Sequence, residues 1–412
     1  MAVQDTDAPI PACQDPDSLA VWLRLANSPG VSHHAAYELL QFFQSPQAVF
    51  AAANERLAGP PACSDAEPPA PAAGTRPRGL LRFEAADDPD DPGGATLISR
   101  AAARLLAGPM PDRIRALAET TWAWAQQPGN HLVLLGSPDY PPSLRHIADP
   151  PLVLHAKGDI SLLQCESVAV VGARNATTQG KANARHFAEA LSQAGMLVVS
   201  GLALGIDAAA HEGGLAGGSG TVAVIGTGID RIYPRRNAAL AHRIAEEGCL
   251  LSEFPLGTHA QARNFPIRNR IIAGMARATL VVEAAQRSGS LITAQAAATA
   301  GRDVYVLPGS IHAPQAVGCN ALIRGGATLV ASAEDLLEDL GLRKPGAPAA
   351  IELDELADSL LKALGHDPIG ADELATRLQL DPSDMQASLL TLELAGVVER
   401  LPGGVFQRLK AP

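Results

Sequence analysis

Short apolar runs rich in β-branched residues recur along the middle of the chain, and alanine-rich stretches with helical periodicity separate most of those after residue 167. The runs predict strands at 131–135, 152–155, 167–172, 196–201, 221–226, 249–254, 279–284, 303–308 and 328–331. Strands that are apolar throughout and alternate with helices are typical of a mostly parallel sheet covered on both faces. We therefore expect an α/β fold for residues 128–340.

Two smaller domains are expected to flank this sheet. Helical spacings at 19–50 and 98–127 predict an N-terminal helical domain over 1–127, of the helix-hairpin-helix or SAM-like kind. Its segment 58–95 holds eight prolines, seven acidic residues and three arginines, a composition that favours a flexible insertion. After a linker at 341–351, residues 352–412 read as a winged helix, with helices near 353–364, 371–379 and 382–395 and strands at 397–400 and 405–409.

The break between the first two N-terminal helices, around Gly30, has two interpretations. In a helix-hairpin-helix the hairpin amides face a phosphate, because the start of the next helix is electropositive. Here Ser32 takes the place of the second glycine usual in that motif. A small packing domain without a ligand is the alternative.

Charge is unevenly distributed along the chain. The whole protein carries a net charge of −11, which argues against a generally basic nucleic-acid surface. Residues 161–330, however, contain 14 Lys and Arg against 10 Asp and Glu, a local excess of +4. A confined positive field on an acidic protein favours a narrow track for a polyanion.

The sequence predicts a cytoplasmic protein with no membrane insertion. Its first twenty residues carry four aspartates and no Lys or Arg, unlike a signal peptide. No apolar run is long enough to span a bilayer. The five cysteines are scattered without a CxxC pair, which is typical of free thiols in a reducing compartment and not of a zinc site.

Two strand ends carry candidate anion sites. Gly172 and Arg174 follow the strand at 167–172, where free amides and a helix start favour an anion. A P-loop would need glycine where Asn175 stands, and a dinucleotide site would need an acid where the next strand ends in Ser200 and Gly201. We therefore expect no nucleotide cofactor, and a phosphate at Arg174, with a surface ion pair as the alternative.

A second group of candidates begins another helix. Arg268, Asn269 and Arg270 crowd a helix that Pro266 is expected to start, and Phe265 lies just ahead of them. Arginines at a helix start suit phosphates, and Phe265 would stack on a base or serve as a buried staple. The turn formed by Ser288, Gly289 and Ser290 adds another amide nest at the same edge of the sheet.

Two groups of residues have the chemistry of an enzyme site. Asp207 and His211 stand four residues apart on one helix, which suits a metal, but no third ligand has a useful spacing. A hydrogen bond in the core is favoured for that pair. Glu283 ends a strand near a Gly/Ser turn and would serve as a general acid or base, yet it lacks a matching partner. We expect no catalytic residue, no metal and no cofactor.

Taken together, these motifs resemble those of the DNA-processing protein A (DprA, or Smf) family. The matching segments run in order from about 131 to 331: Tyr-Pro at 140–141, PLVLHAKG at 151–158, VVGAR at 170–174, SGLALGIDAAAH at 200–211, Tyr-Pro at 233–234, LSE at 251–253, FPIRNR at 265–270, SGSLIT at 288–293 and Pro-Gly at 308–309. The resemblance implies an extended Rossmann-like sheet.

It also implies a function. Proteins of the family that this chain resembles bind single-stranded DNA as homodimers and protect incoming DNA. They help load the RecA recombinase during natural transformation and recombination, and they displace single-strand binding protein. Carried over by motif, the resemblance places DNA contacts at Arg174, Phe265, Arg268, Asn269, Arg270 and the turn at 288–290. The strand-end residues Gly172, Ser200 and Gly201 complete the candidate site.

Of two other functions, a nucleotide hydrolase is the alternative and a transcription regulator fails on charge. Lonely-guy/lysine-decarboxylase-like nucleotide hydrolases share this sheet class, but their P-G-G-x-G-T-x-x-E motif has no counterpart at 287–293, which lacks the glycine pair and the trailing acid. A winged-helix transcription regulator would place cations on its recognition helix. Residues 381–395 instead contain Asp381, Asp384 and Glu393 without Lys or Arg.

Overall fold

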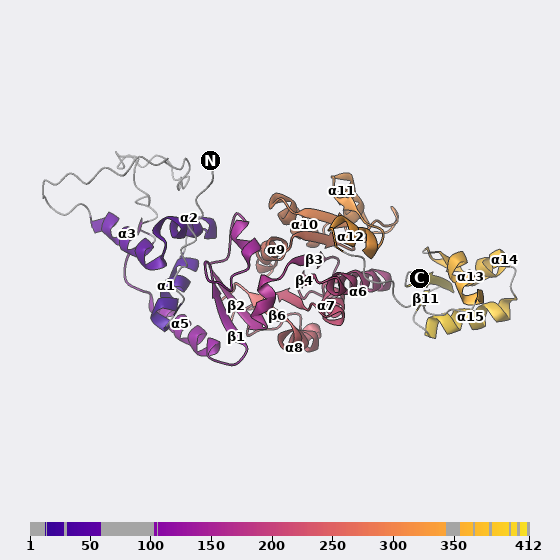
Figure 1. Ribbon diagram of the computed structural model, residues 1–412, viewed down its shortest axis with the longest axis horizontal. Helices are drawn as coiled ribbons and strands as arrows, with labels where there is room; N and C mark the ends of the chain where they lie inside the picture. The colour runs from indigo at the N-terminus through magenta and orange to yellow at the C-terminus, as the bar shows by residue number, and fades with distance from the viewer. Residues whose placement is uncertain are drawn as a thin grey trace.

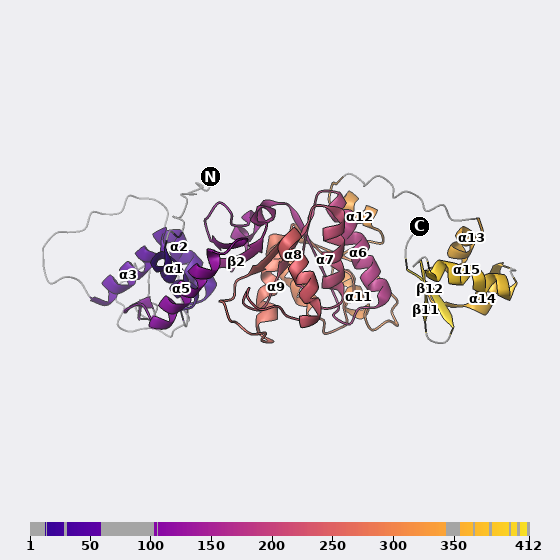
Figure 2. The same cartoon turned by 90° about the horizontal axis from the view of Figure 1, so that it is seen from below.

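The computed structural model describes residues 13, 15–28, 31–58, 103–104, 106–342, 355–365, 367–378, 381–394, 397–401 and 404–409. The N-terminal helices and the winged helix lie at opposite ends of a central sheet domain (Figure 1 and Figure 2). The insertion expected at 58–95 falls outside the described residues except for residue 58, which ends α3 (Pro46–Ala58).

The central domain is a nine-stranded sheet in the order β1-β2-β6-β5-β4-β3-β7-β8-β9. All nine strands occur where the apolar runs predict them: β1 Asn130–Leu134, β2 Val153–Gly158, β3 Ser167–Val171, β4 Leu197–Ser200, β5 Thr221–Val224, β6 Cys249–Ser252, β7 Ala278–Val281, β8 Asp303–Val306 and β9 Thr328–Leu329. Strands β3 to β9 pair in parallel, whereas β2 pairs antiparallel with β1 and β6. The expected mostly parallel, Rossmann-like α/β fold is confirmed.

Helices cover both faces of this sheet, as the alternation predicts. One face packs against α6 (Thr178–Gln193), α7 (Ile206–Gly217), α8 (Ala238–Glu247) and α12 (Ala333–Asp339), and the other against α9 (Asn264–Met275), α10 (Ser290–Thr299) and α11 (Val317–Arg324). Alternate residues of a strand serve the two cores: Val168 and Val170 of β3 face α6, while Ala169 and Val171 face α9.

Helices precede the central sheet along the chain, and a winged helix follows it. The N-terminal helices α1 (Pro16–Ala26), α2 (His33–Phe43), α3 and α5 (Asp112–Ala125) bury Trp22 and share one continuous core with the sheet. Ser32 caps α2, because its hydroxyl accepts a hydrogen bond from the Ala35 amide at 3.1 Å.

The C-terminal domain contains α13 (Glu355–Leu364), α14 (Ala371–Leu378) and α15 (Pro382–Leu394). Its sheet gains a third strand, because β10 (Ile369–Gly370) pairs with β12 (Val405–Arg408), which also pairs with β11 (Val398–Leu401). The Gln179 amide on α6 donates to the Leu409 carbonyl at 3.1 Å and connects this domain to the sheet domain.

Candidate nucleic-acid interface

The order of the strands places a topological switch point between β3 and β7. The chain moves from β3 outward through β4, β5 and β6, and then returns to the other side of β3 to form β7. In open parallel sheets, a ligand site lies outside the carboxyl ends of the strands at such a point. The loops that follow β3, β4, β5 and β7 all reach this edge. They carry most of the residues that the sequence singled out.

The loop after β3 presents Arg174 to solvent and then enters α6. Thr177 caps that helix, since its hydroxyl accepts from the Gly180 amide at 2.9 Å. The Glu283 carboxylate in turn accepts from the Thr177 hydroxyl at 2.6 Å and from the Thr177 amide at 3.0 Å. Both carboxylate oxygens of Glu283 therefore hold the loop in place, which is a structural use of this acid.

Glycines allow the neighbouring loop to approach very closely. A Cβ at Gly205, where φ is +83°, would lie 2.3 Å from the Ala173 carbonyl oxygen, and a Cβ at Gly172 would lie 2.6 Å from Ile206. The loops after β3 and β4 are thus pressed together. Ser200 is fully buried and donates to the Val170 carbonyl at 2.6 Å, so its hydroxyl faces the interior.

Two buried side chains of α7 hold the loop after β4. His211 Nε2 accepts from the Leu202 amide at 3.2 Å, where Leu202 has a positive φ of 56°, and Asp207 accepts from the Ala203 amide at 3.4 Å. His211 Nδ1 lies 2.7 Å from the Thr221 hydroxyl, which donates to the Val198 carbonyl. The ring therefore carries its proton on Nδ1 and is neutral.

Electrostatics agree with that structural role. Burial lowers the pKa of His211 to about 3, and the nearby Arg268 charge lowers it further. Burial also raises the pKa of Asp207, and there the Arg268 charge opposes the shift. Both side chains thus form buried hydrogen bonds, but with loop amides and with Thr221 and not with each other. Among the residues that the structure describes, no group of three or more His, Cys, Asp or Glu side chains is arranged to hold a metal ion.

Arg268 does not lie where the sequence placed it. We expected an exposed arginine at the start of α9, but the residue is only 4% exposed. Its Nη1 donates to the Gly201 carbonyl at 2.7 Å and to the Val224 carbonyl, and desolvation lowers its pKa to about 10. The expectation of an exposed side chain was wrong, because this position of α9 faces the strand ends. A Cβ at Gly201 would meet the guanidinium at 2.5 Å.

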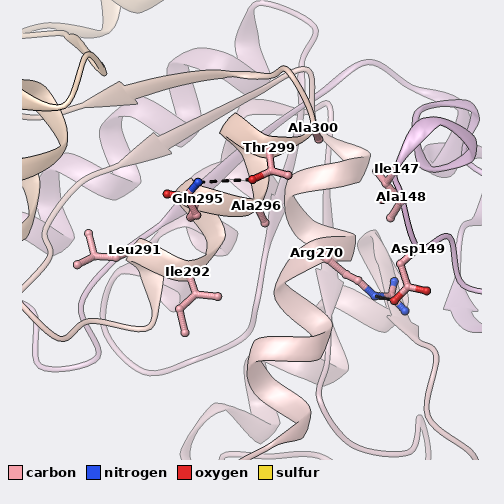
Figure 3. Close-up of a pocket in the computed structure, with 10 residues that line it drawn as sticks. All are labelled: Ile147, Ala148, Asp149, Arg270, Leu291, Ile292, Gln295, Ala296, Thr299 and Ala300. Carbon is pink, nitrogen blue, oxygen red and sulfur yellow. Dashed lines mark hydrogen bonds and ion pairs between the residues drawn. The ribbon is translucent and has the colours of Figure 1, made fainter. Parts of the chain in front are cut away.

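Arg270 is also engaged within the protein. Its side chain is 16% exposed and forms ion pairs with Glu253 and with Asp149, the latter at 3.3 Å. It lines a cavity of about 570 Å³ between α9, α10 and residues 147–149, whose walls are mostly apolar (Figure 3). The two arginines of the motif thus point to different places, since side chains two residues apart on a helix are rotated by about 200° around its axis.

Phe265, in contrast, lies at the predicted edge. The Arg174 guanidinium carbon stands 5.4 Å from the centre of the Phe265 ring, a cation–π contact. The ring centre of Tyr233 lies 5.6 Å from that of Phe265, with the two planes inclined at 40°. Tyr233 comes from the loop after β5, so two loops and the first turn of α9 contribute to one cation–aromatic cluster.

A basic segment beside this cluster was not predicted from the sequence. Arg235 and Arg236 are exposed and open a short 3-10 helix, Arg235–Asn237. Asn237 is buried and donates to the Leu202 and Ala203 carbonyls at 2.9 and 3.1 Å, which fixes the segment to the loop after β4. Within the described residues, no carboxylate pairs with Arg174, Arg235 or Arg236. The sequence does carry a signal for this segment, because Tyr233 is followed closely by Arg235 and Arg236 in the loop after a buried strand.

The turn after β7 completes the edge. The Ser288 and Ser290 hydroxyls lie 2.7 Å apart, and the Ser290 amide donates to Ser288 Oγ at 3.4 Å. The buried Asn269 amide donates to the Gly289 carbonyl at 3.3 Å. Asn269 therefore ties the turn to α9 with its side chain, while Gly289 itself stays exposed.

Comparison with known proteins adds independent information. A family model described as "DNA recombination-mediator protein A" matches residues 131–341, and a model described as "DprA winged helix domain" matches residues 344–404. Within the described residues, no helix is long and apolar enough to cross a membrane.

Similar proteins bear related names. Protein Smf of Escherichia coli K12 is 40% identical over 329 residues, which cover 77% of this chain and 86% of that protein. DNA processing protein DprA of Streptococcus pneumoniae is 45% identical over 200 residues, covering 48% of this chain and 71% of that protein. An X-ray structure of the protein of that name from S. pneumoniae aligns with a TM-score of 0.52 at 38% identity, covering 58% of this chain and 85% of that one.

Proposed function

Because the chain belongs to the DNA recombination-mediator protein A family, also called DprA or Smf, we propose that it binds single-stranded DNA along the carboxyl edge of its parallel sheet. The observation that carries the proposal is the cluster of Arg174, Phe265 and Tyr233 beside the exposed Arg235 and Arg236. Cations that track a backbone, combined with aromatic rings that stack on bases, are the two elements of sequence-tolerant single-strand binding.

The residues of the edge divide into two groups by exposure. Arg174, Phe265, Gly172, Ser288, Gly289 and the arginines at 235–236 are proposed to contact the strand. The buried residues Ser200, Gly201, Arg268, Asn269 and Ser290 support the edge through hydrogen bonds within the protein. Arg270 joins the contact surface only if DNA replaces Asp149 or Glu253 as its partner.

Preference for a single strand follows from the shape of this edge. Loops and helix starts form it, and none of its described elements is a free helix or ribbon that would enter a duplex groove. The winged helix is not proposed as a DNA reader, since residues 381–395 contain three acids and no cation.

The biological role is proposed from the family. The protein acts as a homodimer in the cytoplasm, protects incoming single-stranded DNA during natural transformation and helps load the RecA recombinase in recombination. In doing so it displaces single-strand binding protein from the strand. Sedimentation or light scattering is expected to give twice the chain mass, and addition of the protein is expected to speed RecA assembly on single strands already coated with single-strand binding protein.

We also propose that the protein is not an enzyme. Glu283 is the candidate general acid or base at this edge, and both of its oxygens accept hydrogen bonds from Thr177 in the loop after β3. Incubation with nucleoside monophosphates is therefore expected to release no free base. Release at a rate that disappears in Glu283→Gln would restore the hydrolase alternative.

Salt dependence tests the contact assignment. Each phosphate contact to a single strand contributes about 0.7 to the slope of log affinity against log salt. Arg174→Ala should flatten that slope by about 0.7, and Arg235→Ala with Arg236→Ala by up to about 1.4. Arg185→Ala, an exposed arginine of α6 away from the edge, is the matched control and should change nothing. An unchanged slope in all variants would refute the assignment.

A further inference from the structure

The cation–aromatic cluster has an order that decides which ring is available to a base. Phe265 contacts both other members: the Arg174 guanidinium carbon lies 5.4 Å and the Tyr233 ring centre 5.6 Å from the centre of its ring. The edge of the Phe265 ring also rests on Gly226, where an added Cβ would stand 3.0 Å from it. These three neighbours leave Phe265 only partly exposed, whereas 48% of Tyr233 is exposed.

Stacking needs a ring face that the base can cover. Phe265 already has a cation and a ring against it, so a base on Phe265 would have to displace one of them. Tyr233 is the more exposed of the two rings and therefore has the larger free surface. We propose that Tyr233 is a base-stacking residue of the single-stranded DNA site, with Phe265 as the layer that supports it.

The surroundings of Tyr233 fit a nucleotide as a whole. The exposed Arg235 follows two residues later, close enough along the chain to neutralise the phosphate next to a stacked base. Asn237 anchors the segment to the Leu202 and Ala203 carbonyls, so the platform sits on a fixed loop. Because a ring face accepts every base, the contact should add affinity without sequence preference.

An exposed tyrosine would also suit a protein partner. A DNA base and a protein partner at Tyr233 lead to different results in the following experiment. This inference rests on the proposed function, so the experiment first requires that the full-length chain binds an oligo-dT strand. It then compares oligo-dT with a strand of the same length whose residues are abasic, which keeps the phosphates and removes the bases. Fluorescence anisotropy of the labelled strands gives both affinities.

Tyr233→Ala should bind oligo-dT about 5- to 150-fold more weakly than the unaltered chain, the range expected for one lost stacking contact. The salt slope should stay unchanged, because the ring carries no charge. On the abasic strand, Tyr233→Ala and the unaltered chain should bind equally. Tyr233→Trp should retain affinity for oligo-dT, whereas Tyr233→Leu, which keeps bulk without a ring, should lose as much as Ala.

Melting curves and a matched aromatic supply the controls. Phe42 is 47% exposed and contacts Phe43 at 5.0 Å between ring centres, so Phe42→Ala removes a similar ring from the N-terminal domain and should leave DNA affinity intact. Phe265→Ala should lower the melting temperature, while Tyr233→Ala should not.

Equal binding of oligo-dT by Tyr233→Ala and the unaltered chain would overturn the inference and leave the proposed function standing. An equal loss on dT and abasic strands would overturn it too. If the unaltered chain bound no oligo-dT, the proposed function itself would fail.

Discussion

Replacing Arg268 by methionine should destabilise the sheet domain strongly, although the sequence alone indicates a harmless exposed position. The guanidinium is 4% exposed and donates to the carbonyls of Gly201 and Val224. It is also the positive charge that opposes the raised pKa of the buried Asp207. Methionine fills much of the same volume and supplies neither hydrogen bonds nor charge.

The size of the effect follows from the groups left behind. A buried polar group that loses its partner costs about 1–3 kcal/mol, and here two carbonyls do so. The structure shows no ion pair between Arg268 and Asp207, so the loss of the guanidinium charge only strengthens the rise of the Asp207 pKa that burial already causes. We expect Arg268→Met to lower the free energy of unfolding by about 2–6 kcal/mol, the loss expected for the two carbonyls together.

Urea titration at pH 7, following the transition that unfolds the sheet domain, measures this loss. Arg174→Met is the control, because an exposed side chain should shift stability by no more than about 0.5 kcal/mol. Adding Asp207→Asn to Arg268→Met should recover part of the loss, since it removes the uncompensated charge.

If Arg268→Met were as stable as Arg174→Met, and flattened the salt slope of DNA binding by about 0.7, Arg268 would be an exposed phosphate contact. The buried network described above would then be refuted.

Two further predictions concern pH and the C-terminal domain. Burial holds the pKa of His211 at about 3 against 6.5 in the unfolded chain, so below pH 6.5 the unfolded state binds more protons. The free energy of unfolding should therefore be full above pH 6.5 and fall by about 2 kcal/mol by pH 5. In urea titrations His211→Gln should flatten this trend, and a rise in stability on acidification would contradict it. A chain ending at Lys344 should keep its dimerisation and most of its single-strand affinity, with slightly tighter binding at low salt, because residues 331–360 hold eight acids against two basic residues. Loss of binding by a shortened chain that remains folded would make the winged helix a DNA module.

The fold could be predicted from the sequence because the information is local. Each strand is an apolar run of a few residues, and each helix between them repeats its small residues with helical spacing, so the alternation itself specifies a covered parallel sheet. The order of the strands is not local. Nothing in the run at Val153–Gly158 indicates that it pairs antiparallel with Cys249–Ser252, about a hundred residues later.

The site was predicted less well, for a physical reason. Arg268 and Arg270 read as surface cations, because charged side chains are mostly exposed. Their burial depends on carbonyls at the ends of β4 and β5 and on carboxylates from distant loops, which only the folded chain brings together. Tyr233 was overlooked for the same reason, since its partner Phe265 lies 32 positions further along the chain.

Binding of the unaltered chain to single-stranded and duplex DNA of equal length, across a salt series, tests the central claim most directly. The account predicts tighter binding to the single strand at moderate salt, little dependence on sequence, and a salt slope that corresponds to several phosphates. Equal or tighter binding to the duplex at the same salt would contradict it.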